Sequence, residues 1–326
     1  MKRHHIAVAA VALCLATLAA PASGQKVTFK MWRTPGRYEV TMDMKTDQTI
    51  MAQGMAQPAQ KIAQLMVMVI DVAKPGPSGD RQVTMTFHRI RQSMEMGAMK
   101  MVFDSADKPE NQNPMMGKMF APMLKAKFVI TVGPEGKVKK VQGLDELWGG
   151  MVKQNPAMAG MAKQMKQQFG DSMIKGLMGQ GMQGLPDKPV AVGETWKPTT
   201  KLSMPFVGQA DMRQVCTLKS LMRTPTGQVA VIDYTGTVQS ADGAPTTMGP
   251  MTMTIKKLNL KQSGTMRFNT TTGMFETQTI KQTAEISMVS SGQGEAVSVE
   301  LKQNMATTTK ARKLAPGEQP TTKPAS

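Results

Sequence analysis

Apolar and polar residues alternate one by one along much of this 326-residue chain, a period of two that predicts β-strands. In residues 38–44 the apolar side chains stand at even positions, and in residues 83–88 the same alternation has them at odd positions. Further candidate strands are 65–72, 127–132 and 137–141. One side of such strands is polar, so we expect antiparallel sheets with one wet and one dry face.

The same alternation returns after residue 190. Candidate strands are 213–221, 228–239, 251–260, 264–269, 274–282, 284–289 and 296–304. Gly193-Glu194-Thr195-Trp196 opens this half much as Gly36-Arg37-Tyr38 opens the first. The pattern predicts a mainly β fold with a helical insert, in which two antiparallel β-sheet halves are linked by a Met-rich helical segment. Their similar order raises the hypothesis of a duplication.

The spacing of apolar residues changes to three and four between the halves. Asn155 and Pro156 are typical of a helix start, and the residues behind them form one apolar helix face: Met158, Met161, Met165 and Phe169. A shorter helix is expected behind Asn113-Pro114. The sequence thus divides into a first β half (25–143), a helical segment (144–185), a second β half (186–305) and a tail (306–326). The tail is rich in Thr, Lys and Pro, which predicts disorder.

The first 24 residues have the pattern of an export signal. Lys2 and Arg3 precede an uncharged run from Ile6 to Ala20, and small residues follow at Ala22 and Gly24. The run of about 15 residues is shorter than the roughly 20 that span a bilayer, so we expect cleavage and no transmembrane anchor afterwards. Cys14 follows Leu13, where a lipoprotein site requires a small residue. We therefore expect a periplasmic or secreted protein.

Removal of the signal changes the chemistry of the chain. One histidine, His88, and one cysteine, Cys216, remain, so a zinc site of His and Cys and an intrachain disulfide are excluded. We expect His88 on the surface and Cys216 as an inert buried side chain. Acid pairs such as Asp104 with Asp107 leave a carboxylate hydrolase open, but no catalytic constellation is recognisable. We predict a protein that is not an enzyme and has no cofactor.

The formal charge of +17 falls to +15 once Lys2 and Arg3 are removed. Such a charge favours anionic envelope components as partners. The basic residues are spread along the chain with few aromatic residues between them, which is unlike a stacking surface for nucleic acid. We expect no nucleic acid partner.

Methionine is the unusual component, with 34 residues against 14 aromatic ones. Methionine fills irregular cores, and it also lines surfaces that accept varied apolar partners. Its soft thioether suits Cu(I) as well, and the close spacing of Met94, Met96, Met99 and Met101 is typical of such ligands. General packing, an apolar groove and a copper site therefore remain as interpretations.

Several short motifs carry a resemblance to a known family. They are Met101-Val102-Phe103-Asp104-Ser105, Gly136-Lys137-Val138, Val141-Gln142-Gly143 and the run from Pro189 to Trp196. With the signal, they resemble an uncharacterised family of exported bacterial β-rich proteins. The resemblance implies a large β component and transfers no catalytic residues. At the level of fold alone, a curved sheet with helices across its concave face is similar to periplasmic lipoprotein carriers.

Three functions follow as hypotheses. The first is a non-enzymatic envelope protein whose groove, lined by Met158, Met161, Met165 and Phe169, binds a lipid or hydrophobic peptide. The second is a Cu(I)-binding protein that uses the Met clusters. The third is a structural or interaction protein with no small ligand.

Overall fold

The computed structural model describes residues 24–136, 138–154, 184–204, 208–241, 246–248, 251–291 and 296–321. Its strands in the first half are β1 (Gly36–Ala52), β2 (Met55–Ala56), β3 (Gln60–Val72), β4 (Arg81–Met96), β5 (Met99–Asp104), β6 (Lys127–Val132) and β7 (Val138–Gln142). The helices are α1 (Pro114–Lys125) and α2 (Leu144–Gln154). The later strands are β8 (Thr195–Trp196), β9 (Thr199–Met204), β10 (Gly208–Thr224), β11 (Gly227–Ala241), β12 (Thr246–Met248), β13 (Met251–Asn269), β14 (Met274–Ser291) and β15 (Val297–Lys313).

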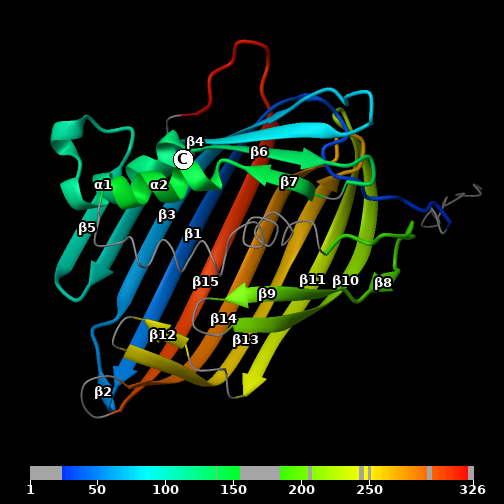
Figure 1. The fold of residues 1–326 in the computed structure, drawn as a ribbon. Coiled ribbons are helices and arrows are strands. Elements are labelled where there is room, and N and C mark those ends of the chain that lie inside the picture. Colours follow the sequence, from blue (N-terminus) through cyan, green and yellow to red (C-terminus); the bar gives the residue numbers. More distant parts are fainter. Residues whose placement is uncertain are drawn as a thin grey trace, which may run out of the picture.

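All strands of the described residues belong to one antiparallel sheet. Its main order is β7-β6-β4-β3-β1-β15-β14-β13-β11-β10-β8. The two expected halves meet in its middle, where the first strand pairs with the last over a register from Tyr38↔Lys313 to Ala52↔Val299. Figure 1 shows this junction as the blue β1 beside the red β15. A mainly β fold with a helical insert is therefore confirmed, and its two halves form one continuous sheet.

The strands agree closely with the period-two pattern. β6 has the predicted bounds, and most of the others extend a predicted strand at one or both ends. The segments 251–260 and 264–269 join into the single strand β13, because residues 261–263 continue the ladder to β14. A bulge between Ile255 and Lys257 shifts the register within it. The predicted segments 274–282 and 284–289 likewise join into β14. Strand lengths were therefore underestimated, and the short strands β2, β5, β9 and β12 were not predicted.

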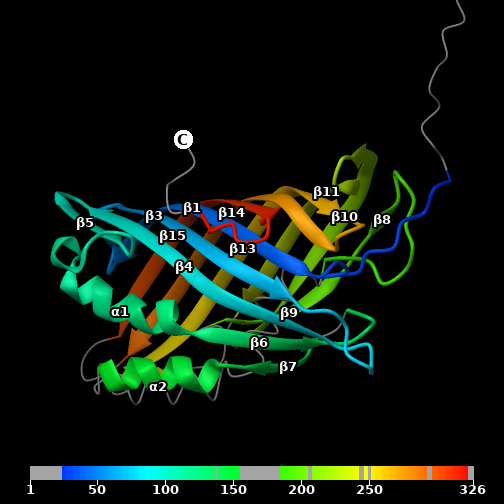
Figure 2. The same cartoon turned by 90° about the horizontal axis from the view of Figure 1, so that it is seen from above.

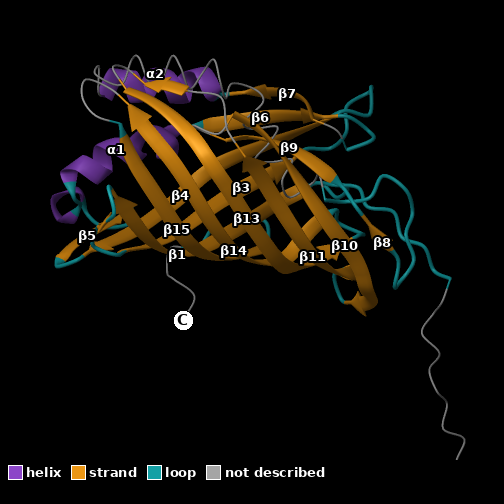
Figure 3. Ribbon diagram, turned by 90° about the horizontal axis from the view of Figure 1, so that it is seen from below, coloured by secondary structure: helices purple, strands orange, loops and turns teal. Residues whose placement is uncertain are grey.

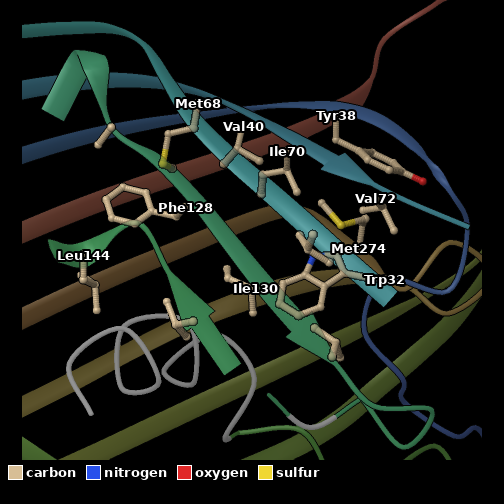
Figure 4. Close-up of a cluster of buried hydrophobic side chains, with 14 of the residues drawn as sticks. Trp32, Tyr38, Val40, Met68, Ile70, Val72, Phe128, Ile130, Leu144 and Met274 are labelled. Atoms are coloured by element: carbon tan, nitrogen blue, oxygen red, sulfur yellow. The ribbon is translucent and has the colours of Figure 1, made fainter. Parts of the chain in front are cut away.

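The sheet is strongly curved, and β6, β7, α1 and α2 lie over its concave face (Figures 2 and 3). Inward residues of β1 and β3, among them Val40 and Met68, pack against Phe128 and Ile130 of β6 and Leu144 of α2 (Figure 4). The two-residue spacing of Val40 from Tyr38 fixes which side of β1 faces this core. The even positions of β1 are thus the inward ones.

Helix α1 begins as the sequence predicts. The side chain of Asn113 accepts hydrogen bonds from the backbone N–H groups of Met115 and Met116, at 3.1 and 3.2 Å, and Pro114 follows it. Met116 and Phe120 then pack on Ile90 and Phe103 of the sheet. The expected helical segment 144–185 is confirmed for α2. The face of Met158, Met161, Met165 and Phe169 lies outside the described residues, as do residues 1–23 of the predicted signal 1–24.

The disorder expected for 306–326 is wrong for its first part. Residues 306–313 complete β15, where Thr307 and Thr309 point inward and are buried. After the strand, Leu314 is 4% exposed and its N–H donates to the carbonyl of Arg37 at 2.8 Å. Ladders to β1 and β14 on both sides satisfy the backbone here, so a polar composition does not prevent order.

Candidate ligand-binding face

The inward positions of the central strands form four rows across the concave side of the sheet. We call these positions the neutral face. From one end of the sheet to the other the rows are Gln64, Met44, Thr307, Ile280 and Gly264; Ile62, Thr46, Met305, Gln282 and Gln262; Gln60, Gln48, Gln303, Ala284 and Leu260; and Ile50, Leu301, Ile286 and Leu258. All of them are half-buried or buried. Five strands thus present one surface made of amides, hydroxyls, thioethers and aliphatic groups.

None of these residues is charged, although the outward positions between them are. Outward neighbours along the same strands include Lys45, Asp47, Lys261, Lys281, Glu285 and Lys302. Alternation along these strands therefore places the charged residues on the outward side and uncharged residues on the inward side. The two halves of the chain share this arrangement. A sheet face that contacts only water does not need to exclude charged residues, because exposed charges cost little free energy.

The glutamines are held by contacts within the sheet. Gln48 Nε2 donates to Gln60 Oε1 at 3.2 Å, and Gln64 Nε2 donates to Gln92 Oε1 at 3.5 Å. An amide both donates and accepts, so a pair of glutamines satisfies part of its own hydrogen-bonding capacity. The surface is consequently polar enough to be wetted and contains no ion that an apolar ligand would have to desolvate.

The period of two did not reveal this face, because a pattern of apolar and polar positions groups glutamine and threonine with the charged residues. A usable signal is present in the sequence all the same. Within residues 44–50 of β1 and 301–307 of β15 the inward polar residues are Thr and Gln, whereas every charged residue stands at a position between them. Distinguishing neutral from charged residues within the polar class separates the two faces.

The methionines proposed as copper ligands are brought together by the β4–β5 hairpin. Met94 stands opposite Met101, and Met96 stands opposite Met99. All four point to the concave side, at the rim of the neutral face, because positions two apart share a face. Met99 is 54% exposed and the other three are half-buried. The structure therefore clusters residues that the sequence had only placed nearby.

The remaining candidates occupy ordinary structural positions. His88 is exposed, as predicted. Cys216 is 3% exposed, and burial raises the pKa of its thiol to about 11, which confirms its place in the core. Asp104 is buried and accepts from Arg89 Nε at 2.9 Å, which gives this carboxylate an ion-pairing role in the fold.

Among the described residues no three His, Cys, Asp or Glu side chains gather where they could hold a metal ion. In the same part of the chain neither helix has the length and apolar character needed to cross a bilayer.

The sequence matches the model of a family described as "Family of unknown function (DUF6263)" over residues 78–275. No curated protein matches. Among solved structures, one described as lipid-protein interactions in lipovitellin has 9% identity and a TM-score of 0.42, and the match covers 88% of this chain and 26% of that one. This chain thus spans about a quarter of the lipovitellin chain.

Two autotransporter domains are also similar. The β domain of BrkA from Bordetella has 8% identity and a TM-score of 0.23, and covers 84% of this chain and 99% of its own. The translocator domain of NalP from Neisseria meningitidis has 8% identity and a TM-score of 0.20, with coverages of 85% and 88%. Scores below 0.5 do not establish a common fold, for these domains or for lipovitellin.

Proposed function

Because the chain belongs to the DUF6263 family, a family of unknown function, we propose from its structure that it binds an uncharged lipid or acyl chain on the neutral face. The observation that carries the proposal is the absence of charge from four rows of inward residues between charged outward ones. We further propose that the protein is not an enzyme and is exported to the periplasm or secreted.

The composition of the neutral face suits an amphiphile. Burial of apolar ligand surface contributes about 25 cal/mol per Å², and Met305, Ile280 and Ile286 offer such contacts. Met305 can adapt to chains of different shape, because its side chain is unbranched and flexible. Gln282 and Gln303 supply neutral hydrogen-bonding groups for an ester or hydroxyl.

The sequence pattern also assigns Met158, Met161, Met165 and Phe169 to ligand binding, and we keep them in the proposal. These residues lie outside the described part of the chain, so their role rests on the sequence pattern. The basic charge of the protein supports a further partner, an anionic envelope component that attracts it to the surface where lipids are found.

The test places single charges on either side of the same strands. Gln282→Glu and Gln303→Glu are close to isosteric and put carboxylates on the neutral face. Thr283→Glu and Asn304→Asp put them on the exposed outward side, one position along β14 and β15. Binding is measured by fluorescence with a diacylglycerol that carries an NBD group, a neutral probe.

The inward pair of substitutions should weaken binding at least tenfold, which corresponds to about 1.4 kcal/mol, because a buried charge must lose its water. The outward pair should change it less than twofold. Equal effects of the two pairs, or no binding of the probe by the unaltered protein, would contradict the proposal. Native mass spectrometry of protein purified from its own envelope should additionally detect a bound lipid.

If no lipid binds but a hydrophobic peptide does, and the inward substitutions weaken the binding of that peptide, then the neutral face has a different occupant. The lipid proposal is wrong in that case. If neither binds, a structural or interaction role without a small ligand is the remaining function.

A further inference from the structure

The β4–β5 hairpin carries two directly opposed pairs of methionines. Met94 faces Met101 and Met96 faces Met99, in an antiparallel register closed by the two residues Gly97 and Ala98. Gly97 has a φ of 57°, which a two-residue hairpin turn requires and glycine adopts without strain. The tight turn fixes the register, so all four side chains stay on one side of the hairpin.

The spacing allows the four sulfur atoms to converge. Directly opposed residues of an antiparallel pair have Cβ atoms about 4.5–5.5 Å apart, and the three torsions of methionine let each thioether turn toward a shared centre. Met99 is 54% exposed, which leaves an entry from solvent. Met101 packs against the cluster of Phe103 and Phe120, so one ligand is anchored while another is accessible.

Two further contacts lie at the hairpin. Gln60 Nε2 of β3 donates to the sulfur of Met96 at 3.6 Å, so this thioether must turn away from β3 to share a centre with Met99 of β5. On the opposite side of the hairpin, Lys100 Nζ lies 2.6 Å from Glu95 Oε1, and these two residues are also directly opposed. The pair has no net charge, so it neither attracts nor repels a cation on the methionine side.

We propose that Met94, Met96, Met99 and Met101 form a thioether site for Cu(I), separate from lipid binding on the neutral face. Thioethers are soft neutral ligands and favour Cu(I) over hard cations such as Ca²⁺ and Mg²⁺. They carry no proton to displace, unlike cysteine or histidine. The affinity for Cu(I) should therefore stay constant over the acidic and neutral pH range, where cysteine and histidine sites lose metal.

The experiment titrates the full mature chain with Cu(I) against the chelator bicinchoninate under anaerobic conditions. The test variant replaces all four methionines by leucine, a substitution of similar volume that preserves the apolar surface. The control replaces Met51 and Met55, two exposed methionines of the adjacent β1–β2 hairpin that do not face each other across it. A milder variant, Met99→Leu, changes a side chain that contributes little to the core.

The fourfold variant should lose at least 100-fold in affinity, Met99→Leu about three- to tenfold, and the control less than twofold. X-ray absorption of the complex should show sulfur neighbours, and the dissociation constant should not change between pH 5 and pH 7. The inference is overturned if the protein cannot compete with the chelator, if the control loses as much as the hairpin variants, or if affinity falls steeply at pH 5. The fourfold variant should still bind lipid, which would show that the copper site is separate from the neutral face.

Discussion

At the scale of single residues, the buried carboxylate of Asp104 shows how ion pairing determines what a side chain does. It accepts hydrogen bonds from Arg89 Nε at 2.9 Å and from the backbone N–H of Ala106 at 3.0 Å, and both charged side chains are 8% exposed. Burial alone would raise the pKa of Asp104, but the hydrogen bonds from Arg89 and Ala106 and the nearby charges bring it below the ordinary value.

Asp104→Asn should lower the free energy of unfolding by about 3 kcal/mol, because it leaves the Arg89 charge buried without its partner. The lowered pKa means that the folded protein releases this proton more readily than the unfolded chain. The contribution of Asp104 is therefore present above pH 4 and lost as the pH falls through the lowered value. Urea unfolding at pH 7 and pH 3 measures both effects. Asp43→Asn, at an exposed outward position, should cost less than 0.5 kcal/mol.

The thiol of Cys216 provides a second prediction at this scale. With a pKa of about 11, only about one thiol in a thousand is ionised at pH 8, and the side chain is 3% exposed. Reaction of the native protein with Ellman's reagent should be at least 100-fold slower than in guanidinium chloride. Rapid reaction without denaturant would show that strand β10 opens readily around this residue.

At the scale of elements, local alternation identified the strands but not their neighbours. The period of two around Tyr38 and around residues 127–132 was sufficient, because side chains of a strand alternate whatever it pairs with. The pairing of β1 with β15 joins residues such as Glu39 and Arg312, which are separated by almost the whole chain, and no local pattern encodes it. The grouping of Met94, Met96, Met99 and Met101 could be proposed from the sequence, because these residues are close along the chain and the turn at Gly97 brings their two strands together.

The segment after β15 was missed for a related reason, since its order depends on distant partners. Glu39 is 4% exposed and accepts from Arg312 Nε at 3.0 Å and from the hydroxyl of Thr321 at 3.0 Å. Hydrogen bonds from Arg312 and Thr321 outweigh the effect of burial and bring the pKa of Glu39 below its ordinary value. A sequence rich in Thr and Lys gives no sign of these contacts.

Leu314→Ala should therefore destabilise the protein by about 2–4 kcal/mol, because Leu314 is 4% exposed and its removal leaves a cavity. Pro316→Ala, at an exposed position two residues further, is the control and should change stability by less than 0.5 kcal/mol. Denaturant unfolding of the two variants gives the comparison. Equal midpoints would mean that the segment after β15 contributes nothing to the fold.

At the scale of the whole molecule, one continuous sheet presents different chemistry on its two sides. Both halves of the chain contribute to the neutral face, and β1 and β15 form its centre. A ligand that lies across β3, β1, β15, β14 and β13 therefore contacts strands from both ends of the sequence. Binding there should add to the connection that the β1–β15 ladder already makes between the two halves.

The consequence is a measurable gain in stability. A neutral diacylglycerol at 100 times its dissociation constant contributes about 2.7 kcal/mol to folding, if it binds only the folded protein. For a chain of about 300 residues, with an unfolding entropy of about 2.1 cal/mol/K per residue, that corresponds to a rise of about 4 °C in the melting temperature. Gln303→Glu should reduce the rise to about half, because tenfold weaker binding lowers the contribution from about 2.7 to about 1.4 kcal/mol, whereas Asn304→Asp, its outward neighbour, should retain it. A rise retained in both variants would place the ligand elsewhere, because charge on the inward side of β15 would then have no influence on its binding.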